Sequence, residues 1–172
     1  MSRAEPVVEI AECEYFIEAM SEHDLLEVVE IEETCGLSQW GWEAYRAELD
    51  RPESVMLIAR LTPHAPTREY AAERVIGFIA ARLNAGELHV NNIGVRETAR
   101  RCGIGSALLG DALEWGAQNG AREAMLEVRA ANGVAQSLYR RHGFQHVGRR
   151  RNYYREPTDD AIVMRLHLAS PA

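Results

Sequence analysis

The sequence predicts a mixed α/β fold, in which a central, mostly antiparallel, twisted sheet of about seven strands carries helices on both faces. Three observations support this fold class. The predicted elements follow the order strand, two helices, three strands, helix, strand, helix and two strands. The residues Asn84-Ala85-Gly86 separate two apolar runs, which is typical of a hairpin. The second of these runs is followed by a loop with Gly103 and Gly105, after which a helix begins.

The first predicted helix follows a short strand over residues 15–19. Ser21 is placed to cap it, with the carboxylate of Asp24 three residues later, an arrangement close to a capping box. Its buried stripe consists of Leu25, Val28 and Val29. We expect this stripe to be short because Glu32 emerges at the next position of the same spacing, and we expect Gly36 to end the helix.

The remaining elements are predicted in chain order. Residues 37–42 form a loop before a second helix that Pro52 closes, residues 62–74 form an exposed excursion, and residues 152–159 form a further loop. Helices are predicted over residues 103–119, where Gly120 is the stop, and from the cap Asn132 to His142. The other strands are predicted over residues 55–61, 75–83, 87–95, 124–129, 143–149 and 161–168.

The composition is that of a globular domain, with 172 residues, 47% hydrophobic and 26% charged. We expect residues 1–12 to form a disordered leader and residues 13–170 to form a single domain. The acidic N-terminus does not resemble a signal peptide and no long apolar run is present, which favours a cytoplasmic protein. Cys13, Cys35 and Cys102 are odd in number and scattered, which argues against a disulfide framework, and no Cys/His spacing indicates a metal site.

The charge is uneven along the chain. A net charge of −7 argues against general binding of nucleic acid or membranes. Acidic residues dominate the first half, whereas the later part is rich in arginine: Arg96, Arg100, Arg101, Arg140, Arg141, Arg149, Arg150 and Arg151. This pattern suits a polyanionic small ligand, with a basic polypeptide as a possible second substrate. For any single arginine, a solvated surface position is the simpler interpretation.

The strand over residues 87–95 contains an irregularity. Leu88 and Val90 share one parity, whereas Ile93 and Val95 share the other, so a regular strand would turn the two pairs to opposite faces. A β-bulge near residues 91–92 would keep both pairs on the core side. Gly94 has no side chain, so another chain or a ligand can approach its backbone closely.

The loop after this strand has the features of an anion site. Two glycines allow a tight turn that exposes backbone N–H groups, and the N-terminus of the following helix adds a partial positive charge. Phosphates are common ligands of such a site, although a strand–glycine–helix connection is also typical of a plain tight turn. The loop lacks the spacing of a nucleoside-triphosphate loop and that of a dinucleotide-binding motif.

Two residues in the second half carry side chains that could take part in acid–base chemistry. Glu127 lies in the middle of an apolar strand, where burial would raise the pKa of its carboxyl and make it a better base near neutral pH. The alternative is an edge-facing carboxylate paired with Arg129 or another arginine. Tyr139 lies on the following helix beside Leu138, where a tyrosine is usually part of the core.

The motif Arg-x-x-Gly-x-Gly at residues 100–105 resembles the acetyl-CoA pyrophosphate loop of the GNAT family of N-acetyltransferases. The segments 126–132 (LEVRAAN) and 138–144 (LYRRHGF) resemble the second half of that domain. The ending 149–154 (RRRNYY), followed by residues 160–164, resembles the RimI-type ribosomal-protein-alanine N-acetyltransferases within it. The resemblance implies a GNAT fold with a bulged strand and a splayed acetyl-CoA cleft.

The resemblance also implies roles for particular residues. Glu127 matches the general base and Tyr139 the general acid that protonates the departing thiolate. Backbone contacts to the pantetheine arm and thioester are implied for Ile93, Gly94 and Val95. Pyrophosphate contacts are implied for Arg101, Cys102, Gly103, Ile104, Gly105 and Ser106. Asn132 matches a pantetheine contact, although a simple helix cap accounts for it equally well. Tyr153 and Tyr154 match residues that line the groove for the acceptor peptide, and ordinary loop packing is their alternative.

The resemblance implies an acetyl-CoA-dependent enzyme that acetylates the free N-terminal amine of a protein, with a ribosomal protein as the expected partner. Two alternatives remain open at this point: an acetyltransferase that acts on lysine or a small amine, and a CoA-binding regulatory module without turnover. The chain departs from the family pattern at Arg100, where the loop often has Gln, and at Gly94, where a small non-glycine residue is common.

Overall fold

The computed structural model describes residues 14–62 and 75–169. Its centre is a seven-stranded sheet in the order β1-β2-β3-β4-β5-β7-β6, and only β4 and β5 run parallel. The strands are β1 (Tyr15–Ala19), β2 (Ser54–Leu61), β3 (Val75–Asn84), β4 (Glu87–Val95), β5 (Glu123–Arg129), β6 (Gln145–Arg155) and β7 (Thr158–His167). The predicted fold class and strand number are confirmed. The expected leader over residues 1–12 and most of the excursion over residues 62–74 lie outside the described residues.

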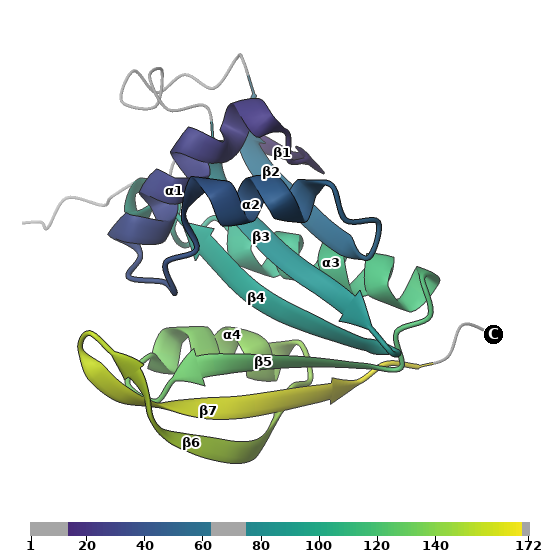
Figure 1. The fold of residues 1–172 in the computed structure, drawn as a ribbon, viewed down its shortest axis with the longest axis vertical. Helices are drawn as coiled ribbons and strands as arrows, with labels where there is room; N and C mark the ends of the chain where they lie inside the picture. Colours follow the sequence, from purple (N-terminus) through teal and green to yellow (C-terminus); the bar gives the residue numbers. More distant parts are fainter. Residues whose placement is uncertain (1–13, 63–74, 170–172) are drawn as a thin grey trace, which may run out of the picture.

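Helices cover both faces of the sheet (Figure 1). The helices α1 (Leu25–Thr34) and α2 (Gly41–Leu49) pack on one face around Tyr45, Ile58 and Phe78. The helices α3 (Ile104–Gln118) and α4 (Gly133–Arg141) pack on the other face in a larger apolar cluster. No helix within the two described ranges is long and apolar enough to span a membrane.

The hairpin between β3 and β4 is tighter than expected. Asn84 is the last residue of β3, so the turn consists of Ala85 and Gly86 alone, with φ values of 50° and 83°. Positive φ at both central residues is the requirement of a type I′ turn, whose twist matches that of the flanking strands. This turn fixes the register in which β4 leaves the hairpin.

The start and end of α1 follow the sequence signals. The backbone N–H of Ser21 donates to the carboxylate of Asp24 at 2.8 Å, and the first turn is a 3-10 turn over Glu22–Asp24. Gly36 has φ of 62°, and the N–H groups of Gly36 and Leu37 donate to the carbonyls of Glu33 and Glu32. This pair of bonds is a Schellman motif, which ends the helix.

The expectation that Glu32 emerges from the buried stripe is wrong. Glu32 is 1% exposed, because the loop that follows α1 folds back over it. Its carboxylate accepts the backbone N–H of Trp40, that of Gly41 at 3.2 Å and the hydroxyl of Tyr45 at 3.1 Å. These bonds also cap the start of α2 at Gly41, so Trp42 lies on the helix and not in the predicted loop.

The predicted bulge in β4 is confirmed. Ala80 of β3 pairs with Asn92 and Ala81 pairs with Val90, so Asn91 is the extra residue. Leu88, Val90, Ile93 and Val95 all pack against the same apolar cluster as α3. Asn92 turns to the opposite face, where its amide donates to the hydroxyl of Tyr45 at 2.9 Å and to the carbonyl of Ser38 at 3.0 Å. The Glu32–Tyr45–Asn92 chain therefore fastens the α1–α2 loop to the bulge.

The parallel pairing of β4 with β5 stops where the bulge begins. It covers Glu87 to Val90 against Glu123 to Leu126, and beyond these residues the two strands separate (Figure 1). The second half of β4 therefore pairs only with β3 on one side. Its other edge pairs with no strand of the described residues and lines the cleft. The carbonyl of Val95 accepts the Cys35 thiol and Nε of Arg100, each at 3.4 Å.

The last two strands are longer than predicted. The sequence indicated a loop over residues 152–159, but β6 continues to Arg155 and β7 begins at Thr158. The pairing resumes after an irregularity between Arg150 and Tyr154, where the N–H of Asn152 donates to the carboxylate of Asp160 at 2.8 Å. Because β6 is an edge strand whose residues are mostly exposed, its sequence carries no apolar alternation that would reveal it.

Replacing Glu32 tests the buried network. We expect Glu32→Ala to lower the free energy of unfolding by about 3 kcal/mol, because two backbone N–H groups and the Tyr45 hydroxyl lose a charged acceptor. Glu33→Ala, at the neighbouring exposed position, is the control and should change stability by less than about 0.5 kcal/mol. Urea unfolding followed by circular dichroism measures both, and equal losses for the two variants would contradict this account.

Candidate functional site

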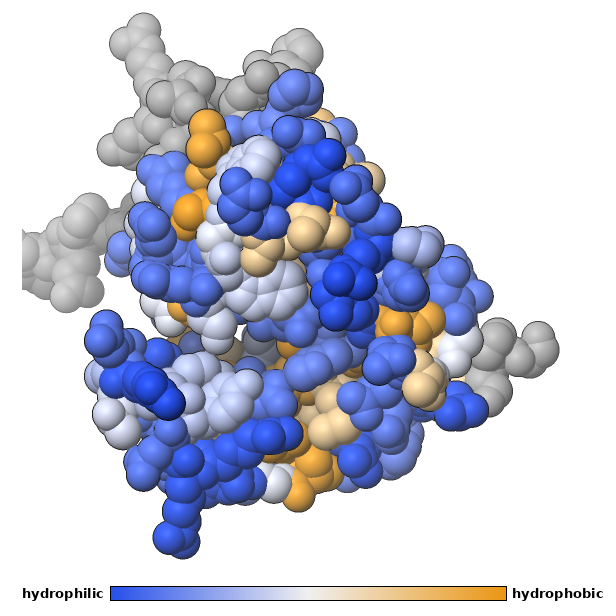
Figure 2. Space-filling view, viewed as in Figure 1, coloured by the Kyte–Doolittle hydropathy of each residue, from blue (hydrophilic) through white to orange (hydrophobic). Residues whose placement is uncertain are grey.

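A cleft of about 650 Å³ occupies the space where β4 and β5 separate. The α1–α2 loop lines it from one face of the sheet, and the start of α3 and the helix α4 line it from the other. Strands β4 and β5 and Tyr154 of β6 also contribute to the lining. The space-filling view shows the surface hollowed between the part that carries α1 and α2 and the part that carries β6 and β7 (Figure 2). The cleft therefore passes through the layer of the sheet.

Most of the site residues predicted from the sequence meet in this cleft. Those that line it are Ile93, Gly94, Val95, Arg101, Gly103, Ile104, Gly105, Ser106, Glu127, Asn132, Tyr139 and Tyr154. Cys102 and Tyr153 are not among the lining residues. Cys102 is disulfide-bonded, so the expectation against disulfides is wrong for this cysteine.

The glycine loop has the backbone of an anion cradle. Arg101 and Gly103 adopt left-handed conformations, with φ of 65° and 75°, and Gly103 is the N-cap of α3. This turn directs the first N–H groups of the fifteen-residue helix toward the cleft, where they have no partners within the helix. The hydroxyl of Ser106, in the first turn, is 2.8 Å from Nε2 of His142, so that side chain is held in place from α4.

Other segments of the chain approach Gly94 closely, which was one of the two possibilities that the sequence offered for its missing side chain. A Cβ at this position would lie 3.0 Å from Ile31, 3.1 Å from Leu37 and 3.2 Å from Phe78. The side of Gly94 that lacks a side chain thus faces α1 and the α1–α2 loop. Its backbone still lines the cleft.

The carboxylate of Glu127 points into the cleft from β5 and is 14% exposed. Its Oε2 lies 2.7 Å from Nε2 of His89 on β4, and its Oε1 lies 3.6 Å from the guanidinium of Arg150 on β6. The hydrogen bond with His89 holds the pKa of the Glu127 carboxyl below its usual value, against burial, which raises it. The sequence-based expectation of a raised pKa is therefore wrong, because it considered burial without this partner.

The same contact acts in the opposite direction on His89. Its hydrogen bond with Glu127 raises the pKa of the imidazole above 6.5, although burial lowers it. The two side chains share a face because His89 alternates with the buried Leu88 and Val90 on β4, as Glu127 does with Leu126 and Val128 on β5. That alternation was readable in the sequence, whereas the pairing of β4 with β5 was not.

Tyr139 is 5% exposed and reaches the cleft from α4, packed edge-on against Phe144 with ring centroids 5.9 Å apart. Burial raises the pKa of its hydroxyl well above 10. A phenol in this position keeps its proton throughout the neutral range, so it can act as an acid but not as a resting base.

Asn132 and Tyr154 also line the cleft. The side chain of Asn132 accepts the N–H of Ala135 at 3.0 Å, so the helix-cap role is confirmed. Tyr154 lies under the guanidinium of Arg129 at 4.2 Å, and burial raises the pKa of its hydroxyl to about 12. Tyr153 packs edge-on against Tyr154 at 5.1 Å and is 48% exposed.

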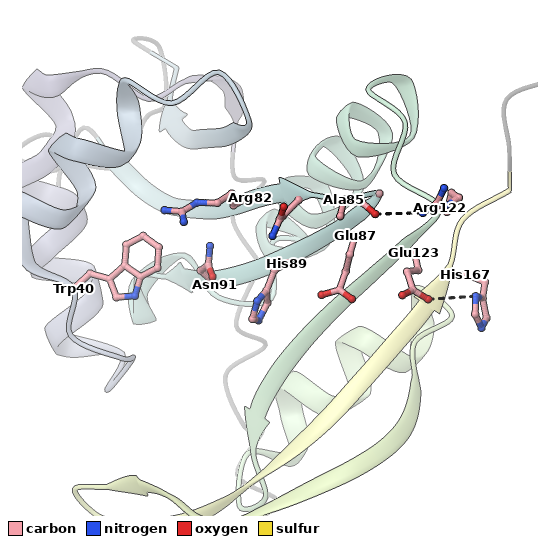
Figure 3. Close-up of a pocket in the computed structure, with 11 residues that line it drawn as sticks. Trp40, Arg82, Ala85, Glu87, His89, Asn91, Arg122, Glu123 and His167 are labelled. Atoms are coloured by element: carbon pink, nitrogen blue, oxygen red, sulfur yellow. Dashed lines mark hydrogen bonds and ion pairs between the residues drawn. The ribbon is translucent and has the colours of Figure 1, made fainter.

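A second hollow, called the groove here, lies beside the cleft on the α1–α2 side of the sheet (Figure 3). It has a volume of about 650 Å³. Its lining includes Trp40, Arg82, Glu87, His89, Arg122, Glu123 and His167. His89 lines the groove and Glu127 lines the cleft, so their contact bridges the two hollows. No cluster of three or more His, Cys, Asp or Glu side chains in the described part of the chain is placed to hold a metal ion.

The chain matches a protein-family model, the sequences of known proteins and solved structures. The model of the acetyltransferase (GNAT) family matches residues 25–144. A putative ribosomal protein bS18-alanine N-acetyltransferase of Bacillus subtilis is 29% identical over 142 residues, which are 82% of this chain and 87% of that protein. The N-alpha-acetyltransferase RimI of Mycobacterium tuberculosis is 43% identical over 86 residues, 50% of this chain and 52% of that protein. The crystal structure of the ribosomal-protein-S18-alanine N-acetyltransferase from Escherichia coli has a TM-score of 0.76 at 25% identity, covering 92% of this chain and 96% of that one.

The contact between Glu127 and His89 predicts a measurable titration. In Glu127→Gln the imidazole loses its carboxylate while burial remains, so we expect the pKa of His89 to fall. NMR titration of the His89 ring protons measures this. Glu114→Gln, an exposed change on α3, is the control for the loss of one negative charge. An unchanged His89 titration in Glu127→Gln would show that the contact does not form in solution.

Proposed function

The chain belongs to the acetyltransferase (GNAT) family, and we propose that it transfers the acetyl group of acetyl-CoA to the free N-terminal amine of a protein. The observation that carries the proposal is that the glycine loop, Glu127 and Tyr139 line one cleft. The relatives named as ribosomal protein bS18-alanine N-acetyltransferases favour a ribosomal protein as the acceptor. Such an acceptor implies that the enzyme acts in the cytoplasm.

The cleft suits acetyl-CoA, which supplies an acyl group activated as a thioester. In this proposal the backbone of Arg101–Ser106 holds the pyrophosphate, as anions are held at helix N-termini. The free edge of β4 at Ile93, Gly94 and Val95 binds the pantetheine arm, with Asn132 opposite. Backbone N–H groups of these strand residues are proposed to stabilise negative charge on the acyl oxygen.

Glu127 is proposed as the general base. Its lowered pKa keeps the carboxylate ionised at neutral pH, so it is ready to accept a proton but is a weak base. A weak base suffices for an α-amine, whose pKa of about 8 leaves about a tenth of it neutral at pH 7. A lysine amine is neutral in only about one molecule in a few thousand at that pH. This difference favours an N-terminal amine over lysine as the acceptor.

Tyr139 is proposed as the general acid. Its raised pKa keeps the hydroxyl protonated until the thiolate leaves, and its burial at the floor of the cleft holds the donor in one position. Tyr154 lines the cleft from β6, and Tyr153 packs beside it; both are proposed to line the path of the acceptor chain. No covalent intermediate on the protein is required.

Peptides test the acceptor. The protein should acetylate a peptide with a free N-terminal alanine and leave the same peptide unmodified when its N-terminus is blocked and only a lysine side chain is free. Mass spectrometry identifies the modified nitrogen. Equal modification of both peptides would favour the lysine or small-amine alternative, and binding of acetyl-CoA without any transfer would favour a regulatory module.

Two conservative variants test the roles of Glu127 and Tyr139. We expect Glu127→Gln and Tyr139→Phe each to lower kcat by about 10²- to 10⁴-fold, because each removes a proton-transfer group and keeps its shape. Affinity for acetyl-CoA, measured by calorimetry, should stay within about threefold of wild type, since neither variant touches the proposed pyrophosphate loop. Wild-type kcat in either variant would exclude that residue as acid or base.

A further inference from the structure

His89 is the partner of Glu127 but lies outside the cleft. Its Nε2 is 2.7 Å from the carboxylate, yet its side chain is 41% exposed and opens to the groove beside the cleft. Glu127 is 14% exposed and opens to the cleft alone. Ligands that fill the cleft therefore cover Glu127 while His89 keeps its access to water.

The contact also fixes which carboxylate oxygen meets the acceptor. Oε2 is engaged by His89, whereas the nearest charged group to Oε1 is Arg150, at 3.6 Å and itself 59% exposed. Oε1 is therefore the oxygen available to take the proton as the N–H bond of the acceptor breaks and an O–H bond forms. A positive charge on the neighbouring imidazole lowers the affinity of that oxygen for the proton, and a neutral imidazole restores it.

We propose that His89 is a positioning residue that orients Glu127 and, by exchanging protons through the groove, sets how strongly Glu127 draws the proton from the acceptor amine. The inference rests on the proposed function. In the neutral range, His89 then determines how the rate of acetyl transfer depends on pH, since the Glu127 carboxylate is ionised throughout that range.

The charged groups around His89 determine whether acetyl transfer accelerates or slows as pH rises. The charged and titratable groups that face it are Glu127 on β5, Arg150 on β6 and Glu87 on β4, and those across the groove are Arg82, Arg122, Glu123 and His167. Glu127 and Glu87 favour the protonated ring and Arg150 opposes it. As pH rises through the raised pKa of His89, the ring loses its charge and Glu127 becomes the stronger base. Acetyl transfer should therefore accelerate with pH in this range.

Three variants separate charge from orientation. His89→Gln keeps a side-chain N–H for Oε2 but cannot ionise, so its kcat should match wild type at high pH and exceed it at low pH by about threefold to tenfold. His89→Ala cannot ionise either and loses the hydrogen bond as well, so its kcat should lie about tenfold below that of His89→Gln at every pH. His167→Gln, in the same groove, is the control and should keep the wild-type profile. One alanine peptide is used throughout, so the titration of its amine is common to all profiles.

The outcomes distinguish the inference from the function on which it rests. If wild type transfers no acetyl group to any peptide, the proposed function fails and this inference with it. If wild type is active and His89→Gln keeps the wild-type pH profile, only the role of charge on His89 is wrong. If His89→Ala matches His89→Gln, the role in orientation is wrong. As a readout independent of turnover, the ¹³C shift of the Glu127 carboxyl should follow the His89 titration in wild type and not in His89→Gln.

Discussion

The extra residue in β4 is the constraint on which the rest of the structure depends. Asn91 interrupts the register with β3 at the point where pairing with β5 ends. It keeps Ile93 and Val95 on the core side with Leu88 and Val90, so the strand bends without exposing apolar side chains. The same bend separates two neighbouring strands and leaves polar backbone along an open edge. A sheet without the bulge would close this gap and have no cleft.

The opposite face of the sheet secures that bulge. The side-chain amide of Asn92 donates a hydrogen bond to the Tyr45 hydroxyl, which in turn donates to the buried carboxylate of Glu32. Because Glu32 also holds the backbone of Trp40 and Gly41, one acidic side chain fixes both the loop that borders the cleft and the strand that forms its wall. Buried polar groups are costly unless every one is bonded, so this network favours a single arrangement of the loop and the strand.

The sequence predicted the fold well where periodicity and turn chemistry are local. The order of strands and helices, the bulge, the stop at Gly36 and the cap at Asn132 all follow from neighbouring residues. Contacts between distant segments were not readable: Glu32 was expected at the surface, and the pKa of Glu127 was given the wrong direction because His89 lies 38 residues away. The edge strand β6 was shortened because exposed strands lack an apolar pattern. Most proposed site residues nevertheless meet in one cleft, because they belong to motifs whose strand and helix ends converge there.

Because the cleft crosses the sheet, it is accessible from both faces, and this affects how two molecules can bind in it. The cleft is bordered by the α1–α2 loop and Tyr154 on one face and by α3 and α4 on the other. Two molecules can therefore enter the cleft from opposite faces of the sheet and meet inside it, without competing for one opening. Neither has to depart before its counterpart arrives, and no hinged cover is needed to bring them together. A cleft with this geometry suits a reaction in which both reactants are held at once.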